Sequence, residues 1–250
     1  MEIETYDLFS QQTPYIGMER QDALSKAKVA VVGAGGLGSF ASEMLVRLGV
    51  GVVRIIDRDM VEYSNLPRTA MYDRSNIGKA KAFVAAQKLS NIVASNRVDG
   101  MIENVAASNV KDVLAGFDVV VDCTDNMDSR YVINKFCVRN KVPWVYGAVL
   151  RDEGFSSTFM AGGRPCLNCI YRMKTKETEK TEQAGVLGPA VAMVASWQAM
   201  EVVKIITGLS EPNYGKLLRI KLDKPIFEFL EIKTQEECEI CGKNLPKNMV

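Results

Sequence analysis

Residues 29–68 read VAVVGAGGLGSFASEMLVRLGVGVVRIIDRDMVEYSNLPR, and this stretch decides the fold. An apolar run at 29–32 leads into a Gly-x-Gly-x-x-Gly turn made by Gly33, Gly35 and Gly38. A helical pattern follows, and a second apolar run at 52–56 ends in Asp57, nineteen residues after Gly38. This order predicts a βαβ unit of two parallel strands and a helix. The acidic residue at the end of its second strand suits a ribose hydroxyl.

The glycines explain what such a turn can bind. Without a Cβ atom, the backbone turns tightly and approaches a phosphate closely, and the start of the helix offers free N–H groups with a partial positive charge. Glycine-rich turns also occur for packing alone, but the flanking strands, the helix and Asp57 favour a nucleotide site. The turn does not separate NAD from ATP.

The composition is that of a soluble α/β protein without bulk attraction to nucleic acid or membranes. The 250 residues are 47% hydrophobic, and 31 Lys and Arg face 30 Asp and Glu. No histidine is present, so acid–base catalysis and metal binding by histidine are excluded. The first residues do not resemble a signal peptide, and the apolar segment 186–206 contains Gln198, Glu201 and Lys204. We therefore predict a helix buried in protein, and a cytoplasmic location.

Further strands are predicted at residues 117–121, 142–149, 155–161, 217–222 and 226–232, the last two as a hairpin. Helices are predicted at 1–27, 78–91 and 128–140, whereas the charged run 172–183 is predicted to be a crossover loop. The expected fold is a Rossmann-like, mostly parallel sheet with flanking helices and antiparallel strands near the C-terminus. We expect one domain over residues 1–250.

Acidic residues follow the predicted parallel strands. Asp57 and Asp59 come after one strand, and Asp122 and Asp125 come after another. Ligands of open parallel sheets bind at the carboxyl ends of strands, and Mg²⁺ prefers carboxylate and phosphate oxygens. The alternative is that Asp122 or Asp125 caps the following helix. Lys79 and Lys81 at the start of the helix 78–91 oppose the helix dipole unless an anion lies nearby, so they either hold a phosphate or lie on a solvated helix face.

Four of the six cysteines form two Cys-x-x-Cys pairs, Cys166 with Cys169 and Cys238 with Cys241. Two such pairs match a structural zinc site of four thiolates, here stapling distant parts of one chain. A redox pair or unlinked thiols are the alternatives. The remaining Cys123 and Cys137 are predicted to be buried structural thiols.

Together these motifs resemble the ThiF/MoeB/HesA family, the bacterial and archaeal relatives of ubiquitin-activating enzymes, from about residue 14 to residue 243. The resemblance rests on seven segments: GAGGLGS (33–39), IIDRDMVEYSNLPR (55–68), GKAK (78–81), DCTDN (122–126), RPCLNCIY (164–171), AGVLGP (184–189) and CEIC (238–241).

The resemblance implies ATP-dependent adenylation of the C-terminal glycine carboxylate of a small ubiquitin-like sulfur-carrier protein ending in Gly-Gly, with release of pyrophosphate. It also implies a homodimer. Carried over by motif, the residues that hold ATP and Mg²⁺ are Gly33, Gly35, Gly36, Gly38, Asp57, Asp59, Asn65, Arg68, Lys81, Asp125 and Asn126. Of these, Arg68, Lys81 and Asp125 are the expected catalytic residues. Charge stabilisation by such groups needs no histidine.

Two departures from the family pattern matter. Many relatives carry a cysteine shortly before the AGVLGP motif that forms a thioester or persulfide, but here Thr181 occupies that place and no cysteine occurs from residue 170 to residue 237. We therefore expect the reaction to stop at the acyl-adenylate. Relatives also often carry an Arg-Gln pair near the N-terminus, where this chain has Gln11 and Gln12. Arg20 as a substitute, weaker phosphate binding and an altered native sequence are the alternatives.

Two other functions explain part of the sequence. An NAD-dependent Rossmann dehydrogenase explains the glycine turn and Asp57, but not residues 64–68, Lys81 or the cysteine pairs. A catalytically degenerate partner subunit explains the missing cysteine, but not the retention of the whole phosphate-binding set.

Overall fold

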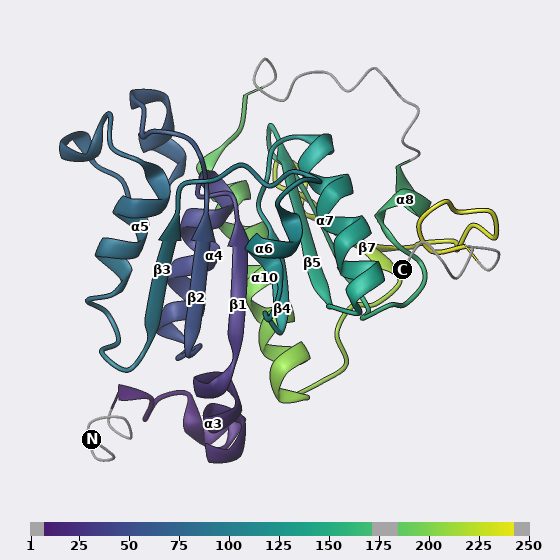
Figure 1. Cartoon of the computed structure of the whole chain (residues 1–250), viewed down its shortest axis with the longest axis horizontal. Helices are drawn as coiled ribbons and strands as arrows, with labels where there is room; N and C mark the ends of the chain where they lie inside the picture. The colour runs from purple at the N-terminus through teal and green to yellow at the C-terminus, as the bar shows by residue number, and fades with distance from the viewer. Residues whose placement is uncertain (1–7, 172–184, 243–250) are drawn as a thin grey trace.

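The computed structural model describes residues 8–171 and 185–242, and its centre is an eight-stranded sheet of order β3-β2-β1-β4-β5-β6-β7-β8 (Figure 1). The first five strands are parallel: β1 (Lys28–Val32), β2 (Val52–Ile56), β3 (Arg97–Met101), β4 (Val119–Asp122) and β5 (Trp144–Leu150). The last three, β6 (Glu153–Phe159), β7 (Lys216–Lys221) and β8 (Ile226–Glu231), are antiparallel to their neighbours. The predicted mixed sheet with a final hairpin is confirmed.

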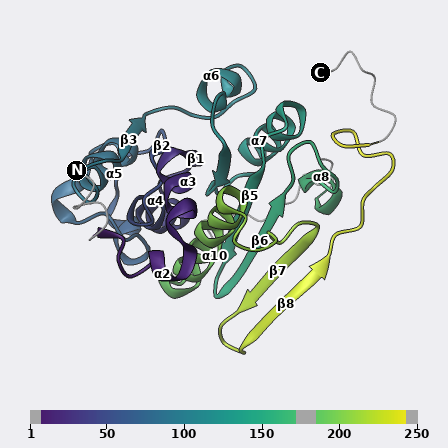
Figure 2. The ribbon, with the colours of Figure 1, turned by 90° about the horizontal axis from the view of Figure 1, so that it is seen from below.

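Helices cover both faces of the sheet (Figure 2). On one face lie α2 (Thr13–Ile16), α3 (Met18–Lys26), α4 (Gly36–Arg47), α5 (Lys81–Leu89) and α10 (Gly188–Thr207), which share a core with β1. On the other face lie α6 (Val110–Leu114), α7 (Met127–Asn140) and α8 (Leu167–Ile170). Val29 and Val31 of β1 face the first core, whereas Ala30 and Val32 face the second. A strand buried on both faces has an unbroken apolar sequence, as residues 29–32 have.

The longest helix, α10, is long and apolar enough by length and composition to cross a membrane. In the fold it packs against α4, β5 and β6, and it buries the polar side chains of Gln198 and Glu201. Glu201 accepts hydrogen bonds from the Thr158 hydroxyl and the Asn213 N–H, both at 2.6 Å, and pairs with Lys204 at 2.7 Å. The prediction of a helix packed inside protein is confirmed.

Three of the described strands and α-helices, β3, α6 and α8, were not predicted from the sequence. Strand β3 has the sequence RVDGM, which lacks an apolar run because the strand is at the edge of the sheet and only partly buried. The short helix α6 also lacks a predicted counterpart. The predicted helix at 78–91 is shorter than expected: α5 begins at Lys81, so Lys79 precedes the helix. The predicted crossover loop at 172–183, including Thr181, lies outside the described residues.

Candidate active site at the carboxyl end of the parallel strands

The glycine-rich turn joins β1 to α4, and two of its glycines are required by close backbone contacts. Gly33 has a φ of +96°, and a Cβ atom added there would lie 2.5 Å from the carbonyl oxygen of Cys123. A Cβ atom on Gly38 would lie 1.8 Å from the carbonyl oxygen of Gly33. By contrast, a Cβ atom on Gly35, which precedes the first residue of α4, would meet no protein atom within 4 Å. The turn is therefore closed toward the protein and open where the N–H groups of α4 begin.

Asp57 lies directly after β2 and is tied to this turn. One carboxylate oxygen accepts the Ala34 N–H at 2.6 Å, and the other accepts the Asp59 N–H at 2.7 Å. Burial raises the pKa of Asp57 from its usual value, although the two N–H donors and Lys81 oppose this shift. Because each carboxylate oxygen can accept a second hydrogen bond, Asp57 can still receive a ribose hydroxyl.

Lys81 is the first residue of α5, and its side chain is almost completely buried. Its Nζ lies 3.3 Å from a carboxylate oxygen of Asp59, and its N–H donates to the Asp59 carbonyl at 2.9 Å. The buried hydroxyl of Tyr72 lies within hydrogen-bond distance of two carbonyl oxygens, that of Ala34 at 2.8 Å and that of Lys81 at 3.3 Å. Tyr72 therefore joins the start of α5 to the glycine turn, so that Lys81 and Asp57 belong to one site.

The segment 64–68 forms a 3₁₀ helix, η1 (Tyr63–Arg68). Asn65, the third residue of this helix, is buried, and its side-chain oxygen accepts the N–H of the N-cap residue Glu62 at 3.0 Å. The Arg68 guanidinium donates to the carbonyl oxygen of Ser64. Cβ atoms added to Gly36 and Gly188 would lie 3.4 Å from the Arg68 carbonyl oxygen and 3.1 Å from the Pro67 carbonyl oxygen, respectively. η1 thus lies between the starts of α4 and α10, beside the glycine turn.

The turn after β4 carries the second acidic pair. Asp122 is fully buried, and one of its carboxylate oxygens accepts the Thr124 N–H at 2.9 Å and the Thr124 hydroxyl at 2.7 Å. The alternative prediction that Asp122 or Asp125 caps the next helix is wrong, because Asn126 is the N-cap of α7 and accepts the Ser129 N–H at 2.9 Å. Asp125 is exposed at this end of the sheet.

Two buried side chains that the sequence reading missed support this turn. Arg130 of α7 donates to the carbonyl oxygen of Thr124 at 2.6 Å, and Gln198 of α10 donates to the carbonyl oxygen of Asp122 at 2.8 Å. Cys123 is buried beside them, with its Sγ 3.6 Å from the Gln198 side-chain oxygen. No local motif marks Arg130 or Gln198, because α7 and α10 reach the turn only through the folded topology.

The predicted site residues therefore fall into three groups. Hydrogen bonds and an ion pair join the glycine turn, Asp57, Asp59 and Lys81, and η1, which carries Asn65 and Arg68, lies beside the turn. Asp125 and Asn126 follow β4, whose neighbour β1 leads into the glycine turn. Arg20 does not belong to the site: it lies in α3, near the opposite end of β1 (Figure 1), and donates to the Ile16 carbonyl of α2 at 3.1 Å. The side chain of Gln12 likewise bonds the Leu48 carbonyl, past the end of α4, at 3.0 Å.

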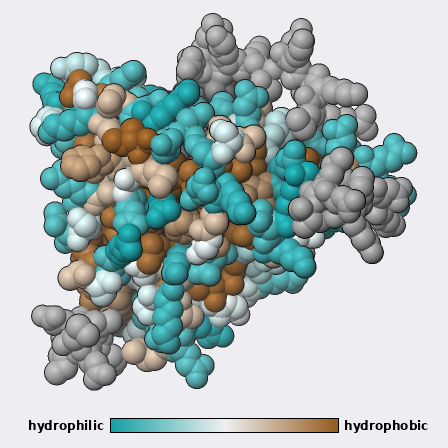
Figure 3. Space-filling model, viewed as in Figure 1, coloured by the Kyte–Doolittle hydropathy of each residue, from teal (hydrophilic) through white to brown (hydrophobic). Residues whose placement is uncertain are grey.

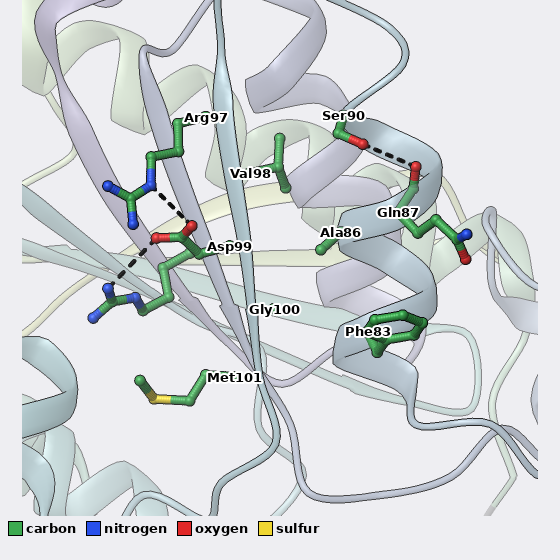
Figure 4. A pocket seen from close by; sticks show the side chains of 10 residues that line it. Phe83, Ala86, Gln87, Ser90, Arg97, Val98, Asp99, Gly100 and Met101 are labelled. Carbon is green, nitrogen blue, oxygen red and sulfur yellow. Dashed lines mark hydrogen bonds and ion pairs between the residues drawn. The ribbon is translucent and has the colours of Figure 1, made fainter.

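A groove of about 590 Å³ lies elsewhere, between α5 and the edge strand β3 (Figure 4). Asp99 of β3 pairs there with Arg97 at 3.0 Å and with Arg54 of β2 at 3.5 Å. On the face of the sheet that carries α6 and α7, Figure 1 draws none of the described helices over β2 and β3. Figure 3, in the same view, shows hydrophobic residues interspersed with hydrophilic ones. The groove is distinct from the glycine turn.

The four paired cysteines meet in one buried cluster. Cys166 and Cys238 have their Sγ atoms 3.7 Å apart, Cys169 and Cys241 have theirs 3.5 Å apart, and all four lie within 4.8 Å of one another. Zn–S bonds of about 2.3 Å in a tetrahedron place sulfur atoms roughly 3.8 Å apart, so the cluster has the size of a four-thiolate zinc site. The side chain of Asn168 donates to the Cys238 Sγ at 3.4 Å. Cys123 and Cys137 are buried outside the cluster, as predicted.

Comparison with known proteins identifies the class. The model of the ThiF family matches residues 9–240, and the chain therefore belongs to the ThiF family. The sulfur carrier protein ThiS adenylyltransferase of Bacillus subtilis is 36% identical over 92% of this chain and 70% of its own length. The molybdopterin-synthase adenylyltransferase of Escherichia coli is 34% identical, over 89% of this chain and 90% of its own length. The SAMP-activating enzyme E1 of Haloferax volcanii is 35% identical, over 91% and 85%. The chain is an enzyme of the adenylyltransferase type.

Solved structures share the fold. A crystal structure of Escherichia coli MccB with MccA-N7isoASN superposes with a TM-score of 0.85 at 23% identity, over 94% of this chain and 75% of that one. A crystal structure of MccB with ATP gives a TM-score of 0.79 at 25% identity, over 89% of this chain and 69% of that one.

Proposed function

We propose that this protein adenylates the C-terminal glycine carboxylate of a small ubiquitin-like sulfur-carrier protein, using ATP and releasing pyrophosphate. The observation that carries the proposal is that hydrogen bonds and an ion pair link the turn, Asp57 and Lys81 at one end of the sheet, with η1 beside the turn. The names of the relatives support a carrier substrate. The family match favours adenylation over an NAD-dependent dehydrogenase.

Each residue has a role that follows from its position. Asp57 would accept the ribose hydroxyls, and the open N–H groups above Gly35 would receive phosphate oxygens. Lys81 and Arg68 would stabilise the charge that develops as the carboxylate attacks the α-phosphorus. In the described structure Lys81 pairs with Asp59, and Arg68 bonds the Ser64 carbonyl, so both cations must exchange these partners for phosphate oxygens.

The two metals fit the residues present. The exposed carboxylate of Asp125 at the end of β4 is a hard oxygen ligand suited to Mg²⁺, which would neutralise the triphosphate when bound. The four-cysteine cluster fits a structural Zn²⁺ that closes all its positions with thiolates. We also propose that residues 1–250 act as one cytoplasmic adenylation domain.

We further propose a homodimer. An apolar groove of about 370 Å³ lies between α2, α4 and α10, where Tyr15 is 75% exposed. A second copy covering this groove would bury these side chains. It would also cover the side chain of Gln12, which lines the same groove. Analytical ultracentrifugation tests this proposal, and a monomer at micromolar concentration would contradict it.

The test of the activity is ATP–pyrophosphate exchange with candidate carrier proteins. We expect exchange that depends on a carrier ending in Gly-Gly, and none with the same carrier lacking its last two residues. A second prediction separates this chain from relatives with a loop cysteine: intact mass spectrometry after the reaction should show no carrier–enzyme thioester. Absence of exchange with every Gly-Gly carrier, together with carrier binding, would instead favour a degenerate partner subunit.

A further inference from the structure

The peptide before Asp125 is held from both sides by a buried ion pair. Asp122 accepts the N–H and the hydroxyl of Thr124, at 2.9 and 2.7 Å. Arg130 donates to the carbonyl oxygen of the same residue at 2.6 Å. Every backbone polar group of Thr124 is therefore bonded to one member of this pair. The next residue but one, Asn126, is fixed as the N-cap of α7, so the backbone of Asp125 is anchored on both flanks.

The surroundings of Arg130 leave it little freedom. Its side chain is 9% exposed, its guanidinium carbon lies 5.2 Å from the centre of the Tyr146 ring, and it also donates to the Gly147 carbonyl of β5 at 3.4 Å. The Arg130 Nε and the second carboxylate oxygen of Asp122 face each other at 3.8 Å, and neither has a hydrogen bond.

Stability alone does not account for this pair. Taking both charges out of water costs several kcal/mol per ion, and hydrophobic residues of the same volume often stabilise a fold equally well. Burial raises the pKa of Asp122 despite the nearby guanidinium, which shows the same cost. What hydrophobic residues could not supply is the fixed orientation of the Thr124 peptide.

We propose that Arg130 is a positioning residue that, with Asp122, orients the Thr124–Asp125 peptide so that Asp125 can hold the Mg²⁺ of Mg²⁺–ATP. This inference rests on the proposed function. In this role Arg130 acts through the position of Asp125. Groups that orient a metal ligand typically affect metal affinity or activity by about 10- to 100-fold, and we expect an effect of this size.

The test compares Arg130→Met with a matched control, Arg54→Met. Arg54 is also partly buried, lies 5.0 Å from the centre of the Phe117 ring and pairs with Asp99 at 3.5 Å, but it belongs to the groove at the sheet edge. Calorimetry measures ATP affinity with EDTA and with Mg²⁺, alongside Tm and pyrophosphate exchange.

For Arg130→Met we expect ATP affinity in EDTA to stay within about twofold, and the gain in affinity on adding Mg²⁺ to fall by about tenfold or more. Exchange kcat should fall in parallel. Arg54→Met should lower Tm without changing either affinity. If Arg130→Met does not fold, Arg130→Lys decides the question, because it keeps the buried charge but lacks the fork of donors.

Three outcomes would overturn the inference: equal loss of affinity with and without Mg²⁺, an unchanged Mg²⁺ effect, or the same Mg²⁺ effect in the Arg54 control. Wild-type protein that gains no ATP affinity from Mg²⁺ would overturn it as well. Failure of the proposed function looks different. In that case the wild type binds Mg²⁺–ATP and Arg130→Met weakens that binding, while no carrier supports exchange.

Discussion

Two alanine substitutions in the same glycine turn should have different effects: Gly38→Ala should lower stability, and Gly35→Ala should weaken ATP binding. In Gly38→Ala the new Cβ would lie 1.8 Å from the Gly33 carbonyl oxygen, whereas an ordinary contact begins at 3.4 Å. The two atoms must therefore separate by about 3.4 − 1.8 = 1.6 Å. Backbone has to supply this movement, since no side chain can rotate away. In Gly35→Ala the new Cβ meets no protein atom within 4 Å.

The magnitudes follow from these contacts. Overpacking costs roughly 1–3 kcal/mol, and we take the upper end because backbone must move. Alanine in place of glycine in a helix stabilises the fold by about 1 kcal/mol, so the net loss of stability for Gly38→Ala is about 2 kcal/mol. For a chain of this size that lowers Tm by roughly 4–8 °C. For Gly35→Ala the stability should change by less than about 0.5 kcal/mol.

The assays are thermal unfolding followed by circular dichroism and calorimetric titration with ATP. Gly35→Ala should keep its Tm and lose at least about tenfold in ATP affinity, because its Cβ occupies the open space above the start of α4. Gly38→Ala should have a lower Tm than the wild type. Equal Tm values for the two variants would refute the contact argument. Unchanged ATP affinity in Gly35→Ala would refute the placement of phosphate over this turn.

Three further predictions use other parts of the molecule. Cys166→Ala should abolish a zinc content of one ion per chain, measured by plasma mass spectrometry, whereas Cys137→Ala should leave it unchanged. Lys81→Met should retain the fold, measured by circular dichroism, but lower exchange kcat by roughly 10²- to 10³-fold, and a smaller loss would argue against charge stabilisation by this lysine. Hydrogen bonds from Lys88 and Ser75 lower the pKa of Asp73 to about 2, below its ordinary value of 3.8. The stabilisation by Asp73 is therefore present above pH 3.8 and is lost toward pH 2, so Asp73→Asn should flatten the decline in unfolding free energy between these values.

Local patterns predicted the parts of the fold that depend on neighbours in sequence. The apolar run at 29–32, the glycines and Asp57 form one continuous βαβ unit, and its spacing alone indicates how it folds. The cysteine pairs carry their own ligand spacing, although the distance between the pairs could not show where they meet. Strand β3 was not predicted, because it is stabilised by pairing with β2 rather than by apolar residues of its own.

The support of the candidate site could not be predicted, since it depends on contacts between residues far apart in sequence. Gln198 reaches the Asp122 carbonyl across 76 positions, and nothing around either residue indicates the pairing. The helix cap illustrates a smaller error. Asp122, Asp125 and Asn126 all have side chains suited to an N-cap, and the choice depends on where α7 begins, which local sequence determines only to within a few residues.

The protonation state of the buried thiols bears on whether the reaction ends at the adenylate. Cys123 is the thiol beside the glycine turn, with its Cβ 3.4 Å from where a Cβ on Gly38 would lie. Burial raises the pKa of Cys123 well above its usual value, and the nearby Asp122 carboxylate raises it further. A thiol held in its neutral form is a poor nucleophile. With no cysteine between residues 170 and 237, the acyl-adenylate should leave this enzyme without a covalent intermediate. Alkylation tests the premise: iodoacetamide should leave Cys123 unmodified in the folded protein at pH 8, and rapid labelling of Cys123 would contradict it.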